Sequence, residues 1–297
     1  MRHFRLISIL ILISSLLLGA CQTLASPDSE KPSVFVSIPP QKYFVERIAG
    51  KTVNVSIMVE PGAEPHTYEP KPAQMAALAN ADLYFSIGDS FEDTWLVRII
   101  DTNPDLQIID TAAGIEKRPL DIHMHEEEGE DHQEGLDPHI WLSPRLVKIQ
   151  ARTIYDALVE LNPEEKVDYD INFVAFLRDI NILETNLTTG FADVSQHRFM
   201  VYHPSWGYFA DEYGLEQIAI EIGGTEPSPS ELASIIEQAK SNDIHVIFAQ
   251  PEFNSRFADT IAEQIDGEVL LISPLEENWM KNMDNLGNVL ISGLSKE

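Results

Sequence analysis

The sequence predicts an α/β protein with two lobes, each built from strands that alternate with helices. Short β-branched apolar runs recur along the chain, separated by segments whose apolar residues have helical spacing. After an N-terminal leader, roughly 265 residues remain, which is enough chain for two lobes with separate cores. A long, uninterrupted helical pattern near the middle of the chain lies between the two halves.

In the first half, a strand, a helix and a second strand follow one another, which is the βαβ rhythm of a parallel sheet. The predicted strands cover residues 34–38, 53–59, 83–87 and 106–109, and the predicted helices cover 41–48, 72–79, 94–100 and 144–161. Gly50 closes the first of these helices.

The central helix is predicted from Pro163 to residue 187. Asn162 suits the N-cap, Pro163 suits the first helical position, and two glutamates follow in the first turn. Apolar residues then recur every three or four positions, at Val167, Ile171, Val174, Leu177, Ile180, Leu183 and Leu187. At 1.5 Å per residue this helix would be about 37 Å long, so it can cross both lobes as a spine.

The second half repeats the α/β rhythm. Its predicted strands cover residues 199–202, 218–222, 246–249 and 269–272. Its predicted helices cover 207–213, 230–239 with Ser230 as the cap, 256–265, and a C-terminal segment that starts near Asn278. Gly214 closes the first of these helices.

The N-terminus reads as an export signal followed by a lipid anchor. Two arginines precede an apolar run that is shorter than the roughly 20 residues of a membrane span. The sequence Leu-Gly-Ala then precedes Cys21, the only cysteine, and this resembles the lipobox of bacterial lipoproteins. The alternative is an ordinary signal peptide with an incidental cysteine. Residues 22–31 are rich in Ser, Pro and charge, which is typical of a flexible tether.

Charge indicates which partners to expect. The formal net charge is -28, so nucleic acid is an unfavourable partner and cations are favourable ones. Between residues 121 and 135 the apolar pattern stops, and His123, His125 and His132 are interspersed with six acids from Glu126 to Glu134. This composition cannot form a core, so we predict a loop there.

Three other histidines have distinctive surroundings. His66 follows Pro65 and precedes Tyr68, His139 lies between Pro138 and Trp141, and His203 is followed by Pro204, Trp206 and Tyr208. Each is expected after a strand or at the entry to a helix, where α/β sheets bind ligands. Three imidazoles suit zinc, so we predict one metal site formed by these residues. A single histidine is more often structural, and His3, His197 and His245 are interpreted in that way.

With these motifs in order, the chain resembles the zinc- and manganese-binding lipoproteins and periplasmic proteins of ABC transporters, the cluster A-I or ZnuA/TroA-like solute-binding proteins. The resemblance covers nearly all of the mature chain: Pro61-Gly62 to Pro70, Ala81-Asp82-Leu83 with Gly88 and Glu92, Asp137 to Trp141, His203 to Tyr208, and Glu226-Pro227-Ser228.

The resemblance implies two (β/α) lobes joined by a rigid spine helix, with the metal in the cleft between them. On this basis we expect a lipoprotein signal peptide at 1–20, a tether at 21–32, an N-terminal lobe at 33–161, the spine at 162–190 and a C-terminal lobe at 191–297. The resemblance also implies delivery of the metal to a membrane permease driven by a cytoplasmic ATPase, by a monomeric protein anchored outside the cytoplasm through Cys21.

The resemblance makes His66, His139 and His203 metal ligands. Manganese-binding relatives commonly have glutamate at the third position, so His203 favours zinc over manganese. The sequence departs from the family at two places where an acid is usual, because Ser273 and Gln250 stand there. The fourth ligand is therefore expected to be water or a nearby carboxylate such as Glu64 or Glu252.

The acidic loop with His123, His125 and His132 resembles the histidine-rich loop of zinc-specific members. It is either a weak secondary zinc site or a solvated insertion with incidental histidines. Two further functional hypotheses stay open. A zinc hydrolase would use the same three histidines, although no His-Glu-x-x-His motif is present. A surface adhesin on the same fold would bind its partner without metal. We expect a transport protein, not an enzyme.

Overall fold

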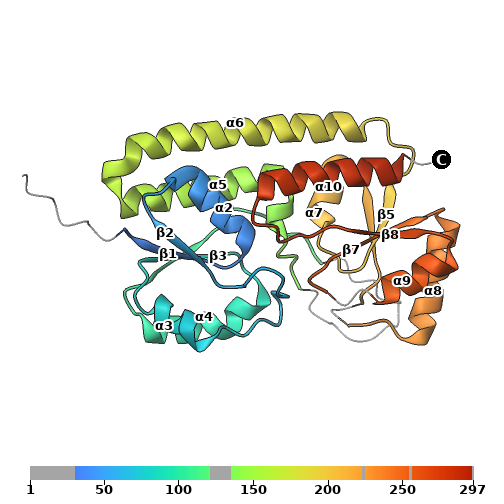
Figure 1. Cartoon of the computed structure of the whole chain (residues 1–297), viewed down its shortest axis with the longest axis horizontal. Coiled ribbons are helices and arrows are strands. Elements are labelled where there is room, and N and C mark those ends of the chain that lie inside the picture. Colours follow the sequence, from blue (N-terminus) through green and yellow to red (C-terminus); the bar gives the residue numbers. More distant parts are fainter. Residues whose placement is uncertain (1–30, 121–134, 223–224, 254–255, 296–297) are drawn as a thin grey trace, which may run out of the picture. The chain divides into compact units, whose positions relative to one another are not determined.

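A computed structural model describes residues 31–120, 135–222, 225–253 and 256–295. In these residues the strands form two four-stranded sheets in which every pair is parallel (Figure 1). Helices connect successive strands, so the predicted α/β class with two lobes is confirmed. Among the described helices, none has the length and hydropathy needed to cross a bilayer. The leader, the lipidation candidate Cys21 and the 121–134 segment lie outside the described residues.

The first sheet has the strand order β2-β1-β3-β4. Its strands are β1 (Ser33–Val36), β2 (Asn54–Ile57), β3 (Leu83–Ser86) and β4 (Gln107–Asp110), and they are connected by α2 (Pro39–Ala49), α3 (Pro72–Leu78) and α4 (Ser90–Thr102). The central strand β3 is buried on both faces, whereas the edge strands β2 and β4 are partly exposed. This is why the central strands read as continuous apolar runs. In Figure 1, α2 lies on one side of this sheet and α3 with α4 on the other.

The second sheet has the equivalent order, β6-β5-β7-β8. Its strands are β5 (Arg198–Val201), β6 (Glu216–Ala219), β7 (Val246–Ala249) and β8 (Glu268–Leu271), and its helices are α7 (Gly207–Tyr213), α8 (Pro229–Ser241), α9 (Arg256–Gln264) and α10 (Trp279–Leu294). Strand order reverses between β1 and β3 in the first sheet and between β5 and β7 in the second. Ligands bind beside such reversals in α/β proteins, so the loops after these strands are the places to look for a site.

The chain passes between the sheets through η1 (Ile140–Leu142), α5 (Pro144–Leu161), the short turn η2 (Pro163–Glu165) and the 26-residue helix α6 (Lys166–Phe191). Figure 1 shows α6 running above both sheets, with α10 beside its second half. One hydrophobic core extends from the first sheet, through α6, to the inner face of the second sheet, where Phe199 and Phe248 belong to it. A second, smaller core lies around Met200, Ile218 and Ile247 in the same sheet.

The predicted apolar stripe of the central helix was wrong in its first half. Val167, Ile171 and Val174 are 69%, 62% and 65% exposed. The buried stripe instead contains the helix's aromatic residues and its later aliphatic ones: Tyr169, Phe173, Phe176, Ile180, Leu183, Leu187 and Phe191. Two apolar stripes with helical spacing compete in this sequence. The larger aromatic side chains remove more apolar surface from water, so their stripe faces the core.

Two predicted helix caps also need correction. Ser228, not Ser230, is the N-cap of α8, where its side chain accepts from the backbone N–H of Glu231 and the Glu231 side chain accepts from the backbone of Ser228. This is a capping box, and Pro229 occupies the first helical position. Asn162 makes no capping hydrogen bond, because the chain enters α6 through the η2 turn.

Two tryptophans connect η1, which lies on the passage between the two sheets, with the segment after β8 and with α10. Trp141 of η1 donates its indole N–H to the carbonyl of Pro274 at 2.7 Å, and Trp279 of α10 donates to the carbonyl of Trp141 at 2.7 Å. Both rings are fully buried, so each donor needs a partner inside the protein. α10 also approaches α6 closely at Gly287, where a Cβ would lie 2.2 Å from Leu187 Cδ2.

Candidate metal centre

The three predicted histidines meet where loops from the two sheets come together. His66 lies on the loop after β2, His139 immediately precedes η1, and His203 follows β5. The Nε2 atoms of His66 and His203 are 3.1 Å apart, and those of His203 and His139 are 3.4 Å apart. All three ligand atoms lie within 4.8 Å of one another. Tetrahedral zinc with Zn–N bonds of about 2.0–2.1 Å separates its nitrogens by about 3.3 Å, so the spacing fits one zinc ion.

Each imidazole has a carboxylate at its other nitrogen. His66 Nδ1 lies 2.9 Å from Asp89 Oδ2, His139 Nδ1 lies 2.7 Å from Asp137 Oδ1, and His203 Nδ1 lies 2.5 Å from Glu221 Oε2. A carboxylate that accepts a hydrogen bond from Nδ1–H keeps the ring proton on Nδ1, and this leaves a free lone pair on Nε2 for a metal ion. The same contact fixes the direction of the ring. The three Nε2 atoms are therefore oriented toward a common point, where each neutral ring with its proton on Nδ1 presents a lone pair.

The Asp137-Pro138-His139 sequence builds its part of the site locally. Asp137 Oδ1 accepts from the backbone N–H of His139 at 2.9 Å as well as from its ring, so one carboxylate fixes both main chain and side chain. The Tyr208 hydroxyl donates to the Asp137 carbonyl at 2.8 Å. Arg118 Nη1 lies 3.5 Å from Asp137 Oδ2, which partly neutralises this fully buried carboxylate. Gly207 makes room for that guanidinium, because a Cβ there would lie 1.7 Å from Arg118 Nη1.

His66 is positioned by a turn and by the next strand. Glu64 accepts from the backbone N–H groups of His66 and Thr67, at 2.8 and 3.1 Å. Ser90, at the start of α4, donates to the His66 carbonyl at 3.1 Å. Asp89 is the N-cap of the same helix, so β3 and α4 hold both the main chain and the ring partner of His66.

His203 is held by the loop after β7. Gln250 accepts from the His203 N–H at 3.1 Å and donates to the His203 carbonyl at 2.6 Å. The Phe253 ring stacks on the His203 imidazole, with 4.3 Å between centroids and 11° between planes. Gln250 is therefore a clamp for the His203 backbone, and the amide that replaces the expected acid has a structural role.

Burial and neighbouring carboxylates set the pKa values of His66 and His203 in this site. His139 and His203 are 3% and 4% exposed. Burial lowers the pKa of His203 to about 4, against the opposing effect of Glu221, so this imidazole is neutral at pH 7. Burial also opposes charge on His66, but its contact with Asp89 raises the net pKa. Neutral imidazole is the form that binds zinc.

The two carboxylates considered as a fourth ligand are engaged elsewhere. Glu64 accepts from backbone N–H groups and the Thr67 hydroxyl. Glu252 accepts from the Ser273 hydroxyl, and burial raises the pKa of Glu252. Neither belongs to the group of ligand atoms within 4.8 Å that the three histidines form. The proposed secondary site, His123, His125 and His132, lies outside the described residues.

Sequence reasoning missed three residues of this centre: Asp89, Glu221 and Phe253. Asp89 and Glu221 were detectable, because each follows a strand of the sheet and so lies at the same carboxyl edge as the histidine it contacts. Phe253 gave no such signal, since an isolated aromatic in a loop has many possible neighbours.

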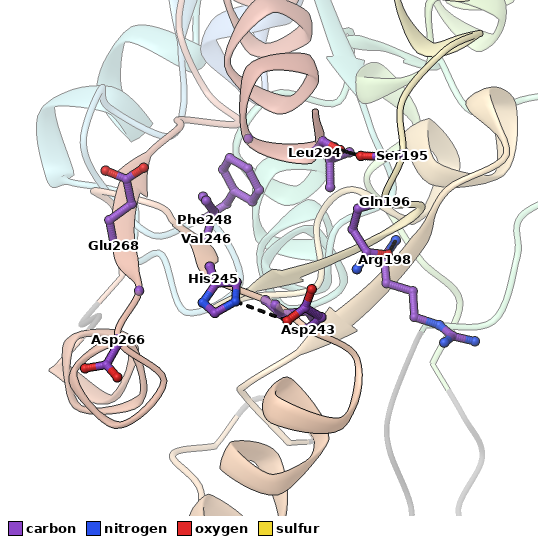
Figure 2. A pocket seen from close by; sticks show the side chains of 13 residues that line it. Ser195, Gln196, Arg198, Asp243, His245, Val246, Phe248, Asp266, Glu268 and Leu294 are labelled. Carbon is purple, nitrogen blue, oxygen red and sulfur yellow. Dashed lines mark hydrogen bonds and ion pairs between the residues drawn. The ribbon is translucent and has the colours of Figure 1, made fainter. Parts of the chain in front are cut away.

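A separate cavity of about 560 Å³ lies at the opposite edge of the second sheet, among residues that precede or begin β5, β7 and β8. Figure 2 shows His245 near its centre, hydrogen-bonded through Nε2 to Asp243 Oδ1 at 3.2 Å. His245 Nδ1 also lies 3.2 Å from the Ile265 carbonyl. The lining of this cavity does not include the three histidines, so the cavity and the candidate metal centre are different features.

Comparison with known proteins agrees with this geometry. A model of the family described as ZnuA, zinc-uptake complex component A, periplasmic, matches residues 34–293. The zinc-binding lipoprotein AdcA of Streptococcus pneumoniae is 30% identical over 275 residues, which cover 89% of this chain and 54% of AdcA. The chain thus spans about half the length of this curated relative.

Two further comparisons cover nearly the whole length of the other protein. The manganese-binding lipoprotein MntA of Halalkalibacterium halodurans is 27% identical, over 97% of this chain and 98% of MntA. A crystal structure of a ZnuA deletion mutant with zinc bound superimposes with a TM-score of 0.83 at 39% identity, over 90% of this chain and 99% of that one. The family match extends over nearly all of residues 32–297, and on that ground the chain belongs to the ZnuA family of metal-binding solute-binding proteins.

Proposed function

We propose that this protein captures zinc outside the cytoplasm and delivers it to the permease of an ABC importer, whose ATPase drives transport. The observation that supports this most strongly is the convergence of the Nε2 atoms of His66, His139 and His203, each with a carboxylate at Nδ1. Such a site binds a metal ion tightly without any further chemistry. Relatives named as zinc-binding and manganese-binding lipoproteins support the same function.

Zinc is the proposed cargo and manganese the less favoured one. Three nitrogen donors suit zinc, whereas manganese prefers oxygen ligands in octahedral geometry. The three histidines are the proposed protein ligands. Water is the proposed fourth ligand, because Glu64 and Glu252 are hydrogen-bonded to other groups.

We further propose that residues 1–20 are a lipoprotein signal peptide and that Cys21 is the lipidated N-terminus of a monomer on the outer face of the cell membrane or in the periplasm. Residues 21–32 would then be the tether, 33–161 and 191–297 the two lobes, and 162–190 the spine.

The proposal is tested by zinc titration against a chromophoric chelator. Alanine at His66, His139 or His203 should weaken zinc binding by orders of magnitude, because each variant removes one of three donors. His245→Ala is the matched control, since that imidazole lies at the other edge of the sheet and should not affect zinc binding. Deleting residues 121–134 should leave the tight site intact. Tight zinc binding by the His139→Ala variant would contradict the assignment.

An enzymatic function is distinguished by turnover. The zinc-loaded protein should not hydrolyse ester, amide or lactam substrates and should instead release zinc only to a competitor or a partner. Sustained turnover that is lost in the His139→Ala variant would replace the transport proposal with a hydrolase.

A further inference from the structure

The side chain of Phe253 is the only ring contact to the histidine cluster from the loop after β7 in the described residues. Its ring lies 4.3 Å from the His203 ring and 6.5 Å from the His66 ring, measured between centroids. The phenyl and His203 planes differ by 11°, so the two rings are stacked face to face. Phe253 therefore covers one face of the His203 ring and lies beside the histidine cluster.

This placement limits the space around a bound ion. An ion bound to Nε2 lies in the plane of its imidazole, about 2 Å from the nitrogen. A phenyl ring parallel to that plane borders one side of the ion without touching it. A water ligand on that side would have to lie against the face of the ring, where it has no hydrogen-bond acceptor comparable with bulk water.

The loop that holds Phe253 is fixed at two points. Gln250 clamps the His203 backbone through two hydrogen bonds, at 3.1 and 2.6 Å. Glu252 accepts from the hydroxyl of Ser273, which lies two positions after the end of β8. Both anchors involve positions at which this sequence departs from the acid that is usual in the family, Gln250 and Ser273. These contacts hold the Phe253 ring beside the histidine cluster, and the Glu252 carboxylate points toward Ser273.

We infer that Phe253 determines metal specificity by restricting the ion to four ligands, three histidines and one water. This inference rests on the proposed function and specifies its substrate as a low-coordinate ion. Zinc is stable with four ligands, whereas manganese and other octahedral ions need two more oxygens than the site would admit. The more open side of the cluster is at His66, whose side chain is 24% exposed, so the single water and the path of entry lie there.

The experiment uses Co²⁺ as a spectroscopic probe and compares the wild type with Phe253→Ala, Phe253→Leu and Phe257→Ala. Phe257 is the matched control, because it loses the same ring from α9, where it stacks with Arg256 at 4.9 Å. Four-coordinate Co²⁺ absorbs visible light much more intensely than six-coordinate Co²⁺. The wild type, Phe253→Leu and Phe257→Ala should give the intense spectrum, and Phe253→Ala the weak one.

Competition between Zn²⁺ and Mn²⁺ supplies the second readout. The ratio of zinc affinity to manganese affinity should fall by about tenfold or more in Phe253→Ala, equivalent to about 1.4 kcal/mol, and stay near the wild-type ratio in the other two variants. An equal loss of affinity for both metals, with an unchanged Co²⁺ spectrum, would show that Phe253 only positions His203 and would overturn the inference. If the wild type itself fails to bind zinc, the proposed function fails, which is a different outcome.

Discussion

The contact between Asp137 and His139 gives the most informative single substitution, Asp137→Asn. Asn keeps the size of the side chain, and its amide oxygen can accept the same hydrogen bonds from the ring and the backbone of His139, now 2.7 and 2.9 Å long. The negative charge is removed, and an amide nitrogen replaces Oδ2, which lies 3.5 Å from Arg118 Nη1. A hydrogen bond to a charged group contributes about 1.5–3 kcal/mol and a neutral one about 0.5–1.5 kcal/mol, so the loss is about 1–2 kcal/mol.

Zinc strengthens this contact because it polarises the Nδ1–H group of the ring that it binds. We therefore expect the zinc Kd of Asp137→Asn to rise by about 5- to 30-fold, which overlaps the range of about 10- to 100-fold seen when such partners of metal ligands are changed. Competition with a chelator measures the Kd, and the melting temperature of the metal-free variant shows whether the fold is intact. Asp211→Asn is the control, because it removes an exposed carboxylate that pairs with the same Arg118 at 2.9 Å but not with a histidine. Equal Kd values for the wild type and a folded Asp137→Asn variant would refute the reasoning.

Three further substitutions test the scaffold. Burial raises the pKa of Glu92 from 4.5 to about 7, so between these pH values the folded chain keeps a proton that the unfolded chain has lost. The free energy of unfolding should therefore decline by about 3 kcal/mol as the pH rises from 4.5 to 7. Urea titrations of Glu92→Gln should lack this decline. Trp141→Phe leaves the Pro274 carbonyl without its donor and should lower the free energy of unfolding by about 1–3 kcal/mol, with no change in urea unfolding counting against the contact. Gly287→Ala inserts a methyl against Leu187, and thermal unfolding should show a cost of about 1–3 kcal/mol, whereas an equally stable variant would mean that the helices separate freely.

Most of the fold could be predicted because local sequence and tertiary environment agree. The strand at Val246–Ala249 and the helices at Pro144–Leu161 and Gly207–Tyr213 have the predicted bounds. The strand β6 begins two residues earlier than predicted, at Glu216. Its second residue, Gln217, is polar but buried, since its side chain accepts from the Trp206 backbone N–H at 2.7 Å. A pattern based on hydrophobicity cannot detect a polar residue whose partner is distant in sequence.

The same limit explains the error in α6. Spacing alone identified a helix, but it did not identify which of two apolar stripes faces the core. That choice depends on the partners that the stripe meets, such as Phe44, whose ring lies 5.9 Å from that of Phe176. The partners come from a distant part of the chain, so the sequence of the helix does not contain the information.

For the candidate metal centre, the sequence predicted the histidines better than the carboxylates that orient them. His66, His139 and His203 were selected by their proline and aromatic neighbours, and the structure places all three together. The residues that orient them, Asp89 and Glu221, are separated from their histidines by 23 and 18 positions. Only the order of strands in each sheet brings these carboxylates to the rings.

The most direct test of the central claim is X-ray absorption at the zinc edge of the mature protein loaded with one equivalent of zinc. We expect a four-coordinate shell with three imidazoles and one oxygen, at about 2.0–2.1 Å. The His139→Ala variant should show two imidazoles. A shell of oxygen or sulfur alone, or an imidazole signal that does not change in that variant, would contradict the claim that these three histidines hold the ion.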